Sequence, residues 1–281
     1  MAGLRPCASP HAAQQYQAHL WNGGMNSEEN PYAFQPVSGD ASAAGSSVGH
    51  FSPTAYVHHG GLATLVRILL VLYLIGLAVG VMSILMQLGL LQEAQSGNMG
   101  PDFESRVKFN DLWRVAVGLF RLALFVVTAI ASLVLLHRLR VNVDQLGATG
   151  LTSSPGWSVG WFFVPVANLW KPFQATRQTW QASENPESWS SVTAPSFIGV
   201  WWTTWILAGI IGQAAWRFPT GTVDQLITGT WIELAAAGVE VVSTVCYMML
   251  FRRLPAVQLK TFRRLSSPSG NESLEDFGPT F

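Results

Sequence analysis

The sequence predicts an all-α integral membrane protein with four transmembrane helices and a Trp/Pro-rich re-entrant or interfacial segment between helices two and three. Two observations lead to this fold class. Hydrophobic residues make up 49% of the 281 residues and charged residues only 11%, whereas about 25% of the residues in a soluble domain are charged. The chain also contains four long apolar runs, each about long enough to cross a hydrocarbon core of about 30 Å.

The first part of the chain, residues 1–60, precedes every apolar run. It is rich in Ala, Ser, Gly, Gln and His and has neither a helical nor a strand period. Such a segment buries too little apolar surface to offset the entropy lost on ordering. We therefore expect a disordered low-complexity tail, through which the protein would contact a protein partner. A multi-pass membrane domain should follow over residues 61–258, and a polar C-terminal tail over residues 259–281.

The four apolar runs give the expected spans of this domain. They cover about residues 68–91, 112–136, 197–216 and 226–251. Gly76 and Gly80 lie four residues apart in the first run, a spacing that lets a second helix approach closely. These two glycines are the predicted helix-packing positions.

The distribution of Lys and Arg predicts the orientation, because cytoplasmic loops are enriched in both. Basic residues follow the second span at Arg138, Arg140, Lys171 and Arg177, and they follow the fourth span from Arg252 to Arg264. The loop after the first span also contains Arg106 and Lys108, which weakens the contrast. We expect both termini in the cytoplasm and the protein in a bacterial plasma membrane.

Residues 154–183 form the segment between the second and third spans, which begins SPGWSVGWFFVPVANLWKPF. The dense apolar part, residues 157–170, is too short for a span and suits a re-entrant or interfacial element. If it did cross, Arg138 and Lys171 would lie on opposite sides of the bilayer. Pro165 would also interrupt a helix at mid-depth. A fifth span is therefore the less favoured alternative.

Six residues define the expected geometry of this segment. The three tryptophans suit the headgroup level, where an apolar ring and a polar N–H are both accommodated. The two prolines are the expected bends, and the asparagine between them is expected to cap or turn the chain. In chain order these residues are Trp157, Trp161, Pro165, Asn168, Trp170 and Pro172.

Several strings in the second half of the chain carry a family resemblance. They are HRLRVNVDQLG from His137, the run from Ser154 to Ser183, VWWTTWIL from Val200 and FRRLPAVQ from Phe251. Together they resemble a family of bacterial membrane proteins catalogued as domain of unknown function 4328, over roughly residues 125–258. The resemblance implies a multi-pass membrane fold. It implies no activity, substrate or catalytic residue.

Three charged residues lie inside the predicted spans, where a charge at the helix centre costs about 2.5–3.5 kcal/mol unless it is paired or hydrated. Arg121 lies ten residues after Asp111, and Glu233 lies nine residues after Asp224. Both would be about 13–15 Å deep, which predicts an Arg121–Glu233 ion pair and leaves Glu240 without a basic partner. These residues would either fix helix packing or line a polar path for protons or ions in which Glu240 titrates.

No recognised enzyme motif accompanies these charges, so we expect a protein that is not an enzyme. We expect no cofactor and no metal site, because His and Cys are sparse and unsuitably spaced. A formal net charge of zero argues against nucleic-acid binding. The leading expectation is a scaffold or regulator that acts with partners at the cytoplasmic membrane face. The alternatives are a small transporter or channel-like protein and, without motif support, an intramembrane enzyme.

Overall fold

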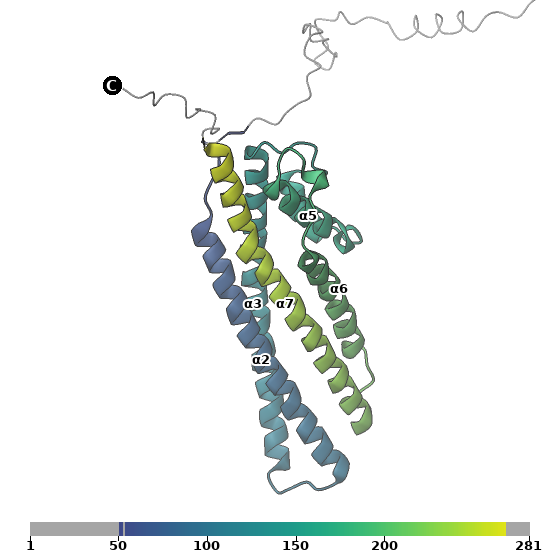
Figure 1. The fold of residues 1–281 in the computed structure, drawn as a ribbon. Helices are drawn as coiled ribbons and strands as arrows, with labels where there is room; N and C mark the ends of the chain where they lie inside the picture. Colours follow the sequence, from purple (N-terminus) through teal and green to yellow (C-terminus); the bar gives the residue numbers. More distant parts are fainter. Residues whose placement is uncertain (1–50, 53, 268–281) are drawn as a thin grey trace, which may run out of the picture. The chain divides into compact units, whose positions relative to one another are not determined.

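The computed structural model describes residues 51, 52 and 54–267, so most of the predicted N-terminal tail and the end of the C-terminal tail lie outside the described residues. Every secondary-structure element in the described part is helical. Four helices are long and apolar enough to cross a membrane, which confirms the predicted fold class. They are α2 (Gly60–Ser96), α3 (Phe103–Gln145), α6 (Ser196–Trp216) and α7 (Val223–Ser266) (Figure 1).

Short connections join these helices into two antiparallel pairs. Gly97, with φ of 71°, ends α2 in the left-handed conformation that glycine adopts without strain. Thr222 begins α7 with a capping box, in which its side chain accepts from the Gln225 N–H and the Gln225 side chain accepts in return. We call the end of the bundle with these two connections the connection end. The opposite end, which carries residues 146–195, is the α5 end (Figure 1).

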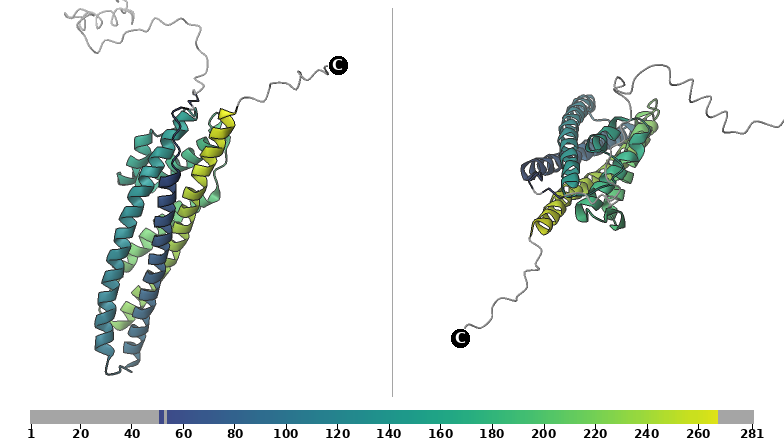
Figure 2. Two further views of the ribbon diagram at one scale, coloured as in Figure 1. Left: turned by 90° about the vertical axis from the view of Figure 1, so that its left-hand side faces the viewer. Right: turned by 90° about the horizontal axis from the view of Figure 1, so that it is seen from above.

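The long helices pack in a sequence that leaves one side of the bundle open. The most extensive contacts join α6 to α7, α2 to α3, and α2 to α7, whereas α3 and α7 approach each other at few positions. Both views of Figure 2 show α7 running beside α2. The outward side of α3 is apolar, and Leu119, Phe120 and Leu122 are each more than half exposed. A helix in water would bear polar residues there, so this face is suited to lipid.

At the α5 end, α3 and α7 run past the start of α6 and pack against α5 (Lys171–Glu184). A fully buried glutamine, Gln258, ties the three helices together. Its Nε2 donates to the Leu139 carbonyl at 2.7 Å and to Ser183 Oγ at 2.9 Å, and its Oε1 accepts from Asn142 Nδ2 at 3.4 Å. We call this arrangement the Gln258 knot.

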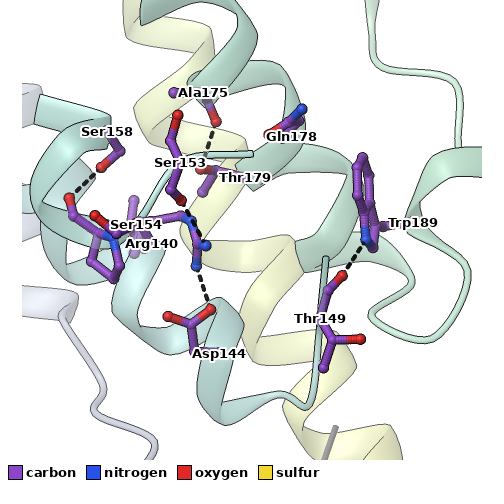
Figure 3. A network of polar contacts seen from close by, with 12 residues as sticks. Arg140, Asp144, Thr149, Ser153, Ser154, Ser158, Ala175, Gln178, Thr179 and Trp189 are labelled. Carbon is purple, nitrogen blue, oxygen red and sulfur yellow. Dashed lines mark hydrogen bonds and ion pairs between the residues drawn. The ribbon is translucent and has the colours of Figure 1, made fainter. Parts of the chain in front are cut away.

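A second polar network fixes the chain between α3 and α5 (Figure 3). The Arg140 side chain is 4% exposed, and its guanidinium donates to Asp144 Oδ1 at 2.5 Å and to the Ser153 carbonyl at 2.9 Å. Further along, Trp189 Nε1 donates to the Thr149 carbonyl at 2.8 Å. The buried Arg140 guanidinium thereby meets two acceptors, as burial of a charged group requires.

Two predicted boundaries differ from the structure. Val57, which belongs to the predicted disordered tail, exchanges backbone hydrogen bonds with the Asn142 amide, and the Tyr56 ring stacks on Phe262 with centroids 4.3 Å apart. The predicted C-terminal tail begins at 259, yet α7 continues to Ser266. Both differences have one cause. α3 and α7 extend beyond the apolar runs, and their extensions provide the surface on which residues 54–59 pack.

Replacing Gln258 with leucine should destabilise the protein by about 1–3 kcal/mol, the cost of leaving buried polar groups without partners. Ser183 Oγ and the Asn142 amide would each lose a contact while the volume stays nearly unchanged. The free energy of unfolding in detergent micelles measures this loss. Gln174→Leu, at an exposed position of the same end, is the matched control. Equal stability of the two variants would contradict the prediction.

Candidate functional site

The charged residues of the apolar helices lie between α3 and α7, where two ion pairs bridge the helices. Arg121 Nη2 donates to Glu240 Oε2 at 2.9 Å, and Arg114 Nη2 donates to Glu233 Oε2 at 2.8 Å. The Tyr73 hydroxyl on α2 donates to the other oxygen of Glu240. Glu240 is thus held from two helices at once, and three helices meet at its carboxylate.

The predicted Arg121–Glu233 pair is wrong, because Arg121 pairs with Glu240, seven residues further along α7, and Glu233 pairs with Arg114. The prediction counted depth from Asp111, whereas α3 begins at Phe103. Measured from the helix starts at Phe103 and Val223, Arg121 is eighteen residues along its helix and Glu240 seventeen. Arg121 and Glu240 therefore lie at nearly equal distances from the starts of their helices, which explains why they pair. Glu240 does have a basic partner.

Gly76 and Gly80, the predicted packing positions on α2, make room for the Arg121 side chain. A Cβ atom built at Gly80 would lie 2.9 Å from Arg121 Nη1 and 3.2 Å from its Cδ. At Gly76 the nearest atoms are Leu124 Cδ1 at 3.5 Å and Arg121 Cγ at 3.6 Å. The neighbour that these glycines accommodate is α3, and Gly80 is the more restrictive of the two positions.

Three voids lie in a row beside the ion pairs. The aromatic cavity, of about 160 Å³, is lined by Tyr73, Thr128, Phe162 and Glu240 among others. The central groove, of about 1130 Å³, opens between α3 and α6 and is lined by Arg121, Glu233 and Glu240. The connection-end cavity, of about 370 Å³, is lined by Arg114, Glu233 and residues 218–220.

The two glutamates lie where these voids meet. Glu240 lines both the aromatic cavity and the central groove, and Glu233 lines both the groove and the connection-end cavity. Their side chains are 30% and 41% exposed, and those of Arg121 and Arg114 are 24% and 29% exposed. The ion pairs are therefore accessible from the voids, and the row runs from the α6–α7 connection to Phe162 at the α5 end.

Several buried polar atoms near the voids have no hydrogen-bond partner in the described part of the chain. On α3 they are Arg121 Nε, Thr128 Oγ1 and Ser132 Oγ, which lie on one helical face. Thr128 is 5% exposed and lines the aromatic cavity. Buried polar groups rarely stay unpaired in proteins, and of these three residues Arg121 and Thr128 line a void.

The Trp/Pro-rich segment folds as α4 (Pro155–Gly160), η1 (Trp161–Phe163) and η2 (Ala167–Leu169), followed by α5. The expected bends contain the prolines. Pro165 lies between the two 3₁₀ turns and precedes Val166, whose φ of 66° is unusual for a β-branched residue. Pro172 lies in the first turn of α5. The location of the segment in the bilayer interface stays a prediction.

The tryptophans of the segment differ in their surroundings. Trp157 and Trp170 are about half exposed, while Trp161 Nε1 donates to Ser153 Oγ at 3.1 Å and Lys171 Nζ lies 5.6 Å from the Trp161 ring centre. Asn168 lies in the η2 turn, as expected of a turn residue; it lines the central groove, and its Oδ1 has no partner among residues 51, 52 and 54–267.

Two residues of the site were not among the predicted site residues. Arg114 lies two helical turns before Arg121 on the same face, so its spacing carried the signal. Tyr73 lies one helical turn before Gly76, on the face of α2 that carries the two glycines. This position is the one sign of its role in the sequence. Among the described residues no cluster of three or more His, Cys, Asp or Glu side chains could hold a metal ion.

Comparison with known proteins gives one match. The family model described as Domain of unknown function (DUF4328) matches residues 102–256. These residues include α3, the Trp/Pro-rich segment, α6 and most of α7, and hence both ion pairs. No curated protein and no solved structure matches the chain.

Proposed function

This chain belongs to the family described as Domain of unknown function (DUF4328), and we propose that it is a transporter- or channel-like membrane protein whose polar path runs through the three voids. Arg121, Glu233 and Glu240 line this path. The four apolar helices indicate a membrane protein. The pairing of these charges beside the three voids supports the transporter-like alternative.

The observation that carries the proposal is the position of the glutamates at the two junctions between voids. A charged side chain in an apolar helix is costly and is usually found facing a bundle interior or a hydrated cavity. Two ion pairs that served only to hold α3 against α7 would need no neighbouring voids. Here the pairs face three voids in a row, so any polar species that moves along the row meets both carboxylates.

A proton is the species that suits the path best. The Glu240 carboxylate accepts from the Tyr73 hydroxyl, and both residues line the aromatic cavity, so two groups of the kind that relay protons are in contact there. Arg114 and Arg121 hold the two carboxylates in place through the ion pairs. The path would therefore pass protons from group to group.

Proton flux in liposomes tests the proposal. The full chain would be reconstituted with a pH-sensitive dye inside and a potassium diffusion potential as the driving force. Wild type should acidify the lumen faster than empty liposomes, and Glu240→Gln should lower the rate to that background. The amide oxygen of glutamine can still accept from Arg121 and Tyr73, so the variant should fold.

Glu104→Gln is the matched control, because Glu104 pairs only with Lys108 on the surface and its side chain is 81% exposed. It should conduct like wild type. Wild-type flux equal to that of empty liposomes, or full flux through Glu240→Gln, would rule out the path.

The scaffold or regulator remains a second candidate, supported by an exposed apolar surface at the α5 end. Phe163 is 72% exposed, Val166 68% and Leu169 55%; Phe163 and Leu169 belong to the 3₁₀ turns, and Val166 lies between them. Such a surface suits the membrane interface or a protein partner. The even number of apolar helices supports termini on one side, which positive-inside reasoning makes the cytoplasm of a bacterial cell. If wild type does not conduct, co-purification with and without residues 1–60 becomes the deciding measurement.

A further inference from the structure

We propose that the aromatic cavity binds a small organic cation of the quaternary-ammonium class. The proposal deepens the transporter-like function, on which it rests, by naming a substrate class for the same path. It depends on four properties of the cavity, namely its aromatic lining, its charge, its unpaired hydroxyl and its size.

Six aromatic side chains line the cavity, and they come from every long helix and from η1. They are Tyr73, Phe125, Phe162, Trp201, Trp205 and Tyr247. The face of an aromatic ring carries partial negative charge and attracts a cation within about 6 Å of its centre. Quaternary ammonium groups are recognised by such aromatic cages because they cannot donate hydrogen bonds. Trp201 and Tyr247 stack on each other with ring centroids 4.8 Å apart, and the lining as a whole supplies aromatic rings of the kind that this cation class contacts.

The charge of the lining is also suitable for a cation. Glu240 is the one ionisable carboxylate among the lining residues, and none of them is basic. Tyr73 occupies one of its oxygens and Arg121 the other. A carboxylate offers about four acceptor positions, so two stay free. Arg121 reaches Glu240 from the central groove rather than through the cavity.

Thr128 supplies a polar group that the protein leaves unused. Thr128 lines the cavity and is 5% exposed, and its Oγ1 lies just behind the cavity surface, buried and without a partner among the described residues. An unpaired hydroxyl in an aromatic-lined cavity suits a ligand that carries a hydroxyl beside its cationic head. A quaternary ammonium alcohol has both groups.

The volume of about 160 Å³ limits the ligand. A cavity of about 150 Å³ in another protein accommodates benzene, so a ligand with only a few heavy atoms fits. Choline and tetramethylammonium are small enough for this volume, whereas drug-sized ligands need a pocket of about 300 Å³ or more. Phe162 from η1 lines one side of the cavity, so the Trp/Pro-rich segment contributes directly to the site.

Binding of choline and of its neutral isostere, 3,3-dimethyl-1-butanol, tests the proposal. The isostere replaces the ammonium nitrogen by carbon and keeps shape and hydroxyl. The full chain would be placed in phosphatidylglycerol nanodiscs, which lack choline headgroups, and titrated by calorimetry. Choline should bind about thirtyfold more tightly than the isostere, the ratio equivalent to a desolvated cation–π contribution of about 2 kcal/mol. Equal affinities, or no binding of either compound, would overturn the proposal.

Two variants test whether the preference for choline over its isostere arises in the aromatic cavity. Trp205→Leu removes an aromatic face, and Phe125→Leu does the same from α3, so a folding defect in one leaves the other informative. Each should reduce the preference for choline over the isostere, while Trp231→Leu, an exposed position on α7 outside the cavity lining, should preserve it. An unchanged preference in both cavity variants would contradict the site.

The outcome is separable from that of the flux measurement. Choline binding without proton flux would support the cation site in the aromatic cavity and contradict the proton path. Proton flux without a preference for choline over its isostere would support the proton path and contradict the cation site.

Discussion

Arg121→Leu should lower the free energy of unfolding by about 2.5–3.5 kcal/mol, because it leaves the Glu240 carboxylate without its cation among apolar helices. Tyr73 would still donate to Glu240, but a hydroxyl does not neutralise the charge. Removing one partner of a low-dielectric ion pair is strongly destabilising for this reason. Equilibrium unfolding by denaturing detergent in mixed micelles measures the effect.

The double variant Arg121→Leu/Glu240→Leu is the control for this loss. With both charges gone, the desolvation cost disappears, and the double variant should be more stable than Arg121→Leu alone. The coupling energy of the double-mutant cycle then reports the contact itself. If the two single losses simply add, the pair seen between α3 and α7 does not contribute, and the site as described is wrong.

Gly80→Leu should cause a loss of similar or greater size through the same contact. A Cβ at Gly80 already lies 2.9 Å from Arg121 Nη1, so a leucine there displaces the guanidinium from Glu240. The cost combines the unpaired carboxylate with overpacking, which adds about 1–3 kcal/mol. Unfolding under the same conditions as for Arg121→Leu gives the value.

Gly76→Ala is the matched control, because a Cβ there meets its nearest neighbours at 3.5 Å, an ordinary contact distance. It should be nearly neutral. A second control places Gly80→Leu in the Arg121→Ala background, where the shortened side chain leaves space and the penalty should shrink. An equal penalty in both backgrounds would show that Gly80 accommodates something other than Arg121.

The sequence predicted the helices well because apolar runs reveal spans directly. Each predicted span lies within one long helix, as in 197–216 within α6 (Ser196–Trp216). Helix ends were harder, because charged residues can extend a helix past its apolar run. Glu104 and Lys108 form an i,i+4 ion pair in the first turns of α3. Such a pair stabilises a helix, but two charged residues lower the local hydropathy and so suggest a loop.

This misplaced helix start explains why the partners of the charges were mispredicted. Arg121, Glu233 and Glu240 were recognised as site residues from their apolar surroundings alone. Their pairing depends on the register of α3 against α7, and a seven-residue error in register shifts every partner by one heptad. Tyr73 was beyond sequence reasoning, because a tyrosine hydroxyl meets Glu240 only through the packing of α2 on α7.

The aromatic cavity was also hidden in the sequence. Its lining comes from four long helices and η1, so no local spacing could place Phe162 beside Trp201 and Tyr247. The expected Trp/Pro-rich segment was identified as a distinct element, yet its Phe162 was not. Residues that converge from five elements become a site only when the tertiary fold is known.

The proline within α7 has a mechanical consequence. α7 is one continuous helix from the ion pairs to the Gln258 knot, and Pro255 lies inside it between Glu240 and Gln258. Proline removes one hydrogen bond of the helix and crowds the carbonyl four residues before it, so bending stiffness is lowest there. The position at which α7 bends most easily therefore lies between the ion pairs and the Gln258 knot.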